Sequence, residues 1–179
     1  MKINLYGLKA IYLHEMDRFR RTLGQSLLSP VISTSLYFIV FGSVIGGYVQ
    51  KIDGISYGSY IVPGLLMLTL LTQSISNTSF GIFFPKFNGT IYEILAAPIS
   101  TFEIVLAFVS AGATKTLIVG TVIFITASFF VDVEVQFPLL MIFLLILVSF
   151  TFALFGFLIG ILSKDFEPVS YTHLTLPTK

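Results

Sequence analysis

Four long apolar stretches, separated by short polar segments, dominate the pattern of hydrophobic and polar residues along the chain. Three of them contain no charged residue (22–50, 54–85 and 135–163), and the remaining one (101–131) contains only Glu103 and Lys115. A helix needs about 20 apolar residues to cross the hydrocarbon core of a bilayer, so each stretch is long enough. The alternation typical of a membrane β-barrel is missing. We therefore predict an all-α membrane protein with spans at about residues 27–49, 59–83, 101–130 and 138–162.

The N-terminal segment carries a different, amphipathic pattern. Its apolar residues recur every three or four positions and form one narrow helical stripe: Leu5, Leu8, Tyr12, Met16 and Phe19. The charged residues fall outside this stripe: Lys9, Asp17, Arg18, Arg20 and Arg21. This pattern predicts a helix at about residues 3–21 that lies in the membrane interface before the first span. We interpret its three arginines as topology determinants in preference to a docking site.

The distribution of Lys and Arg predicts the orientation in the membrane. One side of the membrane would carry Lys2, Lys9, Arg18, Arg20, Arg21, Lys86 and Lys164, and the other only Lys51. Cytoplasmic loops are enriched in Lys and Arg, so the N-terminus and the segment at 86–100 should face the cytoplasm. We expect a multi-pass membrane protein with a cytoplasmic N-terminus.

The polar segment between the second and third spans specifies a short helix. Two capping boxes, Thr90 with Glu93 and Ser100 with Glu103, are expected to start helices. Pro98 disfavours helical conformation at the residue before it, so the first helix should stop there, giving a helix at about 90–97.

The two faces of this short helix should differ. Ile91, Ile94 and Leu95 can pack toward the bundle, while Tyr92 and Glu93 point elsewhere. From the residues alone, a plain connector and a docking element for a cytoplasmic partner fit equally well.

Composition excludes several classes of function. Hydrophobic residues make up 55% of the 179, charged residues only 11%, and mean hydropathy is +0.95, whereas soluble domains carry about 25% charged residues. The chain has no cysteine and only two histidines, so we expect no metal site. The net charge of +1 and the absence of a basic patch argue against a nucleic-acid partner. No P-loop motif is present, so we expect the chain not to bind nucleotide phosphates itself. With only two histidines no Ser/His/Asp set is plausible, and we expect no catalytic or cofactor-binding residue and no enzyme activity in this chain.

Polar residues inside the spans are the remaining candidates for function. Lys115 is the one ionisable residue well inside a span, and we favour a structural or interfacial role for it over contact with a substrate. A polar stripe on the second span includes Gln73 and Asn77, and interhelical hydrogen bonding explains it as well as a substrate path does. Two GxxxG pairs, at Gly42 and Gly156, would allow close helix approach.

Several segments resemble permease subunits of the ABC-2 type transporter family. They are "FPKFNGTIYEILAAPIS", the amphipathic N-terminal helix, "YIVPGLL" and "FGFLIGILSKDFE". The resemblance implies an ABC-2 type transmembrane domain over residues 1–168, part of an expected six-helix bundle. It also implies that the short helix is a coupling helix for an ATPase subunit, with Gly89, Thr90, Glu93 and Pro98 in that role.

The resemblance further implies a location, the cytoplasmic (inner) membrane of a bacterium, and a mode of action. It predicts an exporter in which two permease subunits, as a homodimer, work with two ATPase subunits that hydrolyse ATP. A non-transporting membrane scaffold and a secondary transporter are the alternatives. The cargo stays open among drugs, lipid-linked glycans and other amphiphiles.

The end of the chain does not continue this pattern. Residues 169–179, "VSYTHLTLPTK", resemble translated sequencing-adapter read-through, and we expect them to be a non-native tail on a fragment that lacks the last two spans. The alternative is a genuine short tail on a four-span protein.

Overall fold

A computed structural model describes residues 4–41, 51–52, 55–131 and 135–163. Six helices make up nearly all of this part: α1 (Leu5–Arg21), α2 (Leu23–Val40), α3 (Tyr57–Phe87), α4 (Ile91–Ala96), α5 (Thr101–Ser128) and α6 (Pro138–Leu162). Two two-residue strands, β1 (Lys51–Ile52) and β2 (Ile55–Ser56), pair antiparallel. Helices α2, α3, α5 and α6 are long and apolar enough to cross a membrane. The predicted all-α membrane fold is confirmed.

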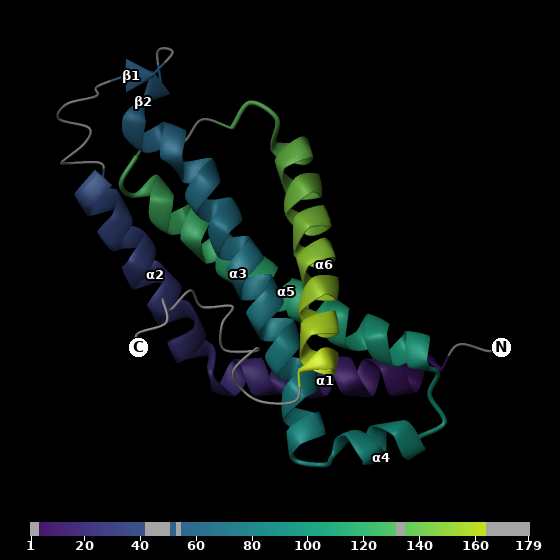
Figure 1. The fold of residues 1–179 in the computed structure, drawn as a ribbon. Helices are drawn as coiled ribbons and strands as arrows, with labels where there is room; N and C mark the ends of the chain where they lie inside the picture. The colour runs from purple at the N-terminus through teal and green to yellow at the C-terminus, as the bar shows by residue number, and fades with distance from the viewer. Residues whose placement is uncertain (1–3, 42–50, 53–54, 132–134, 164–179) are drawn as a thin grey trace.

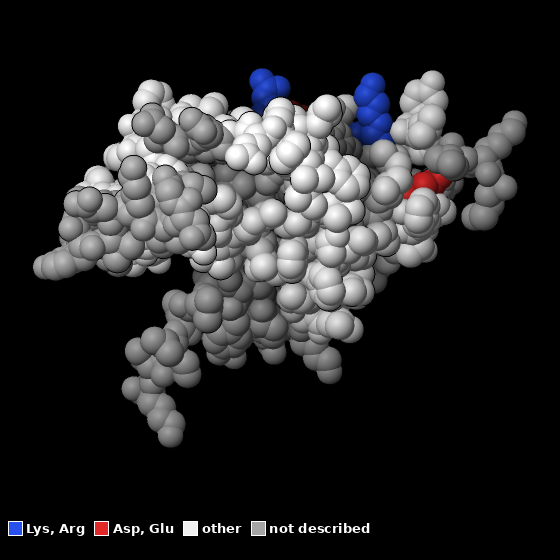
Figure 2. All heavy atoms as spheres, turned by 90° about the horizontal axis from the view of Figure 1, so that it is seen from above, with Lys and Arg blue, Asp and Glu red and all other residues white. Residues whose placement is uncertain are grey.

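The long helices form a bundle, and α1 lies across one end of it (Figure 1). α3 packs against both α5 and α6, while α1 runs along α5. The short helix α4 lies at the same end of the bundle as α1 (Figure 1). On the face seen from above, white uncharged residues make up nearly all of the described part, and the few charged side chains visible lie along one edge (Figure 2). Large apolar side chains of α6 are exposed, such as Leu139 at 84% and Leu162 at 76%, which suits a lipid environment.

The apolar stripe of α1 packs largely against the bundle. Phe19 is buried in a cluster with Val119 and Ile123 of α5, and Met16 packs against the same cluster. The Tyr12 hydroxyl donates to Thr114 Oγ1 over 3.2 Å. The interfacial location of α1 stays a prediction, but part of the stripe predicted to face lipid contacts α5 instead.

α1 and α2 are joined directly at Thr22, without a loop, and we call this junction the α1–α2 elbow. The Thr22 hydroxyl donates to the carbonyl oxygens of Arg18 and Phe19, both at 3.3 Å, and so closes α1. The helix resumes at Leu23, earlier than the predicted start of the first span near residue 27. The predicted end of that span and the Gly42 pair lie outside the described residues.

Side-chain caps and a proline mark the first turns of the later helices. Ser56 Oγ accepts from the Ser59 N–H at the start of α3, and Pro138 occupies the first turn of α6, where its missing N–H costs nothing. Ser100 and Glu103 form the complete capping box predicted for α5, with distances of 3.3 and 2.8 Å.

Close contact between α3 and α6 depends on glycine. An added Cβ at Gly156 would meet the backbone of Ile75, and one at Gly160 would meet the backbone of Ser79. Ser74 Oγ also donates to the Ser149 carbonyl oxygen across this interface, over 2.6 Å. The close helix approach predicted from this GxxxG pair is present.

Candidate functional site

The turn from α3 into α4 is made by glycine. Gly89 has φ +80°, a conformation that side-chain-bearing residues rarely adopt. Thr90 therefore already has helical backbone angles, with φ −65° and ψ −13°, and its side chain makes no cap. Its hydroxyl instead donates to the Pro85 carbonyl oxygen over 3.4 Å. The capping box predicted for Thr90 and Glu93 is wrong, because an N-cap residue needs an extended backbone.

α4 has one face on the bundle and one face outward. Ile91 and Ile94 pack against a buried cluster of α3, α5 and α6 side chains that includes Phe108. Tyr92 is 73% exposed and Glu93 is also exposed. Leu95 was expected to pack inward, but it is 59% exposed. Ile99, beyond Pro98, packs against the cluster in addition to Ile91 and Ile94.

The connector after α4 is bonded to the start of α1. Ala97 is extended, with φ −72° and ψ 150°, as expected before proline. The Asn4 side-chain amide donates to the Pro98 carbonyl oxygen over 3.1 Å, and the Asn4 backbone N–H donates to Glu103 Oε1 over 2.5 Å. Glu103 thus caps α5 with one oxygen and holds α1 with the other. Sequence reasoning found the cap but not the contact with α1, since nothing local links residues so far apart.

Lys115 belongs to a buried cluster of charges. Its ammonium lies 2.7 Å from Glu15 Oε2, and the Arg18 guanidinium lies 2.9 Å from the same oxygen. Lys115 and Glu15 are only 3% and 2% exposed, and Arg18 is 36% exposed. Sequence reasoning missed Glu15, although its spacing from Tyr12 and Phe19 places it on the inward face of α1.

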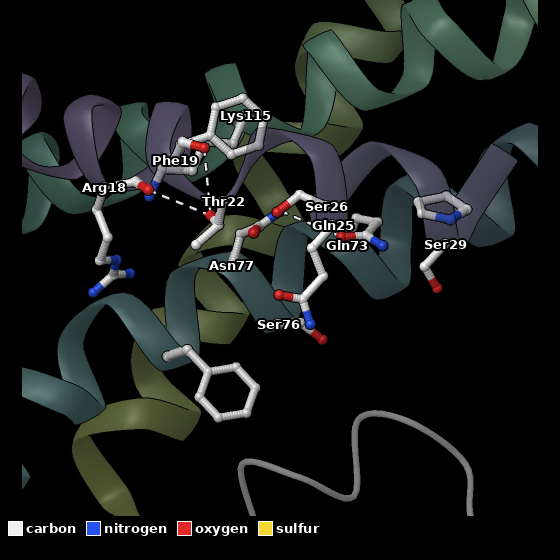
Figure 3. A pocket seen from close by; sticks show the side chains of 12 residues that line it. Arg18, Phe19, Thr22, Gln25, Ser26, Ser29, Gln73, Ser76, Asn77 and Lys115 are labelled. Atoms are coloured by element: carbon white, nitrogen blue, oxygen red, sulfur yellow. Dashed lines mark hydrogen bonds between the residues drawn. The ribbon is translucent and has the colours of Figure 1, made fainter.

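A cavity of about 390 Å³ adjoins this cluster (Figure 3). Its lining comes from the α1–α2 elbow, α3 and α5: Arg18, Phe19, Thr22, Gln25, Ser26, Ser29, Pro30, Gln73, Ser76, Asn77, Phe80 and Lys115. The structure therefore brings all three intramembrane polar candidates, Gln73, Asn77 and Lys115, to one pocket. Asn77 donates to Gln73 Oε1 within α3, over 3.5 Å.

The four candidates for ATPase coupling do not meet in one pocket. Gly89 and Thr90 shape the entry to α4, Glu93 lies on its outer face, and Pro98 ends it. They share one end of the bundle, where α4 is presented (Figure 1). No group of His, Cys, Asp and Glu that could hold a metal ion occurs in the part of the chain that the structure describes.

Comparisons with known proteins agree with this architecture. Residues 6–172 match the family described as ABC-2 type transporter. The inner membrane transport permease YadH of Escherichia coli (strain K12) is 36% identical over 170 residues, covering 95% of this chain and 66% of the relative. YadH of Shigella flexneri matches equally well. Nodulation protein J of Azorhizobium caulinodans is 23% identical over 121 residues, 67% of this chain and 48% of the relative.

The chain thus spans 66% of the length of the YadH relatives. No solved structure matches it significantly. The family match over nearly the whole chain, the similarity to inner membrane transport permeases and the four membrane-length helices lead to one conclusion: the chain belongs to the ABC-2 type transporter family, as a multi-pass membrane protein.

Proposed function

We propose that this chain is the permease part of an ATP-driven exporter and that α4 receives the movement of a separate ATPase subunit. The observation that supports this most directly is the division of α4 into two faces. Ile91 and Ile94 anchor it to the bundle core, while Tyr92, Glu93 and Leu95 are left on the outside. A six-residue helix is marginal alone, so its fixed presentation depends on this packing.

Hydrogen bonds would transmit a movement of α4 directly to the bundle. Pro98, at the end of the α4 connector, accepts a hydrogen bond from Asn4 of the α1 N-cap. Glu103 joins the same Asn4 to the first turn of α5. A partner that displaces α4 would therefore displace α1 and α5 together, as a rigid-body movement carried by packed contacts.

We extend the proposal to the rest of the assembly, with family membership as its support. A second permease subunit, as a homodimer, and two ATPase subunits would complete the transporter, with ATP hydrolysis in the ATPase subunits. Cargo would move outward across the bacterial inner membrane. The alternative is that α4 is a plain connector in a membrane scaffold that does not transport. Substitutions of Glu93 distinguish this alternative from the proposal.

Orientation can be tested with single cysteines, because the chain contains none. We expect Asn88→Cys to be shielded from an impermeant thiol reagent on intact cells, whereas Asp53→Cys and Glu134→Cys should be labelled. The excess of Lys and Arg on the side of Asn88 is the reason. Permeabilised cells, in which all three positions should react, provide the control. Labelling of Asn88→Cys alone would invert the topology.

Glu93→Arg should weaken ATPase coupling without preventing membrane insertion. Reversing a charge in a docking site costs several kcal/mol through like-charge or unpaired contacts, so we expect a loss of about tenfold or more in association with the ATPase subunit. The measurement is co-purification of the ATPase subunit and substrate-stimulated ATP hydrolysis in the assembled transporter. Because Thr90 forms no capping box, the loss cannot be assigned to a broken cap.

Glu93→Gln is the matched control, since it removes the charge but keeps the size and polarity of the side chain. It should fall between the wild type and Glu93→Arg. Normal association, hydrolysis and export by both variants would mean that α4 is only a connector.

A further inference from the structure

The cavity beside the α1–α2 elbow has the lining of a binding site for an anion. Two cations, Arg18 and Lys115, reach it, together with the side-chain amides of Gln25, Gln73 and Asn77. None of its lining residues is acidic. Its volume of about 390 Å³ falls in the range of small-ligand pockets.

The charges around the cavity are not balanced. Glu15 is the only acid that pairs with Arg18 or Lys115 among the described residues, and both cations contact the same oxygen, Oε2. The three groups together keep one net positive charge. A guanidinium has five N–H donors in a planar fork that matches phosphate, and Arg18 is partly exposed, so it retains donors for a ligand.

Among the described residues, hydrogen bonding between helices does not account for Gln73 and Asn77, the two α3 amides that line the cavity. Asn77 bonds to Gln73 on its own helix, and at 3.5 Å this bond is long. The side-chain bonds from α3 to the backbone of α6 come from Ser74 and Lys86, and neither residue lines the cavity. Gln73 and Asn77 therefore present polar groups to the cavity from α3.

We propose that this cavity binds the phosphate group of an anionic amphiphile. A phosphodiester monoanion would balance the net positive charge, and Arg18 with the neighbouring amides would supply charge-assisted and neutral hydrogen bonds. We expect the ligand to be an amphiphile because the cavity lies beside α1. With α1 in the membrane interface, the cavity is at the depth of the lipid headgroups. This step rests on the proposed function, which places α1 at the cytoplasmic face.

Binding can be measured on the purified chain in a non-ionic detergent, without any ATPase subunit. Three probes separate the sources of binding: a short-chain phosphatidylglycerol, inorganic phosphate, and an uncharged alkyl glycoside as the lipid without phosphate. We expect saturable binding of phosphatidylglycerol, weaker binding of inorganic phosphate, and no saturable binding of the glycoside. Since ATPase docking is not measured, failure here is distinct from failure of the coupling role of α4.

Arg18→Gln should reduce phosphatidylglycerol affinity about tenfold or more. Arg20→Gln is the matched control, because Arg20 lies on the same helix, is 78% exposed and does not line the cavity. Gln73→Glu is a second test that keeps side-chain size while placing a negative charge in the cavity. It should abolish binding even if Arg18→Gln folds poorly.

Equal losses in Arg18→Gln and Arg20→Gln would overturn the proposal, because they would show non-specific attraction to a basic helix. Undiminished binding by folded Gln73→Glu would also overturn it, as would glycoside binding equal to that of phosphatidylglycerol. Inorganic phosphate binding as tightly as the lipid would keep the phosphate site but assign it to a free anion.

Discussion

Gly156→Val should severely destabilise the packing of α6 on α3. A Cβ built at Gly156 lies 2.5 Å from the carbonyl oxygen and 2.9 Å from the Cα of Ile75. These are backbone atoms, so no rotamer change can relieve the contact. Overpacking costs about 1–3 kcal/mol even where side chains can adjust, and here a whole helix must move. We expect a cost near or above the upper end of this range.

Thermal denaturation of the detergent-solubilised protein, followed by size-exclusion chromatography, measures this effect. A loss of about 3 kcal/mol corresponds to a fall in melting temperature on the order of 10 °C. Gly64→Val is the control, because Gly64 lies in α3 but an added Cβ there meets nothing within 4 Å. Similar melting temperatures for the two variants would show that α3 and α6 do not pack as closely as the structure indicates.

Glu15→Leu should have the second large effect. It removes the partner of Lys115, whose side chain is only 3% exposed, and leaves a buried cation unpaired. Removing one partner of a buried ion pair costs about 3–5 kcal/mol. Asp17→Leu is a matched control on the same helix, because Asp17 is 63% exposed and lies 4.0 Å from Arg20. Its loss should stay below about 1 kcal/mol.

The double variant Glu15→Leu with Lys115→Met separates charge from packing. Replacing a buried ion pair with apolar side chains is often neutral or stabilising, so the double variant should recover most of the stability lost in Glu15→Leu. Denaturation curves of the four proteins form a double-mutant cycle, and we expect an interaction energy of about 2 kcal/mol or more. Purely additive effects would mean that Glu15 and Lys115 do not interact.

Local and solvent-imposed features were predictable from the sequence. The four spans are apparent because the bilayer requires about 20 apolar residues for each. The end of α4 before Pro98 and the cap of α5 at Ser100 and Glu103 follow from steric and hydrogen-bonding rules that act over a few residues. The same local rule failed at Thr90, where the positive φ of Gly89 had already turned the chain into a helical conformation.

The candidate site was only partly predictable. Lys115, Gln73 and Asn77 could be singled out because polar groups in spans are costly, but the sequence did not show that they line one cavity with Arg18. Nor could it show that Glu15 neutralises Lys115, since 100 residues separate them. Sequence patterns report periodicity and short-range bonding, whereas these contacts exist only because α1 packs along α5. The tertiary structure decides which distant polar groups share a low-dielectric interior, and therefore which of them are paired and which can bind a ligand.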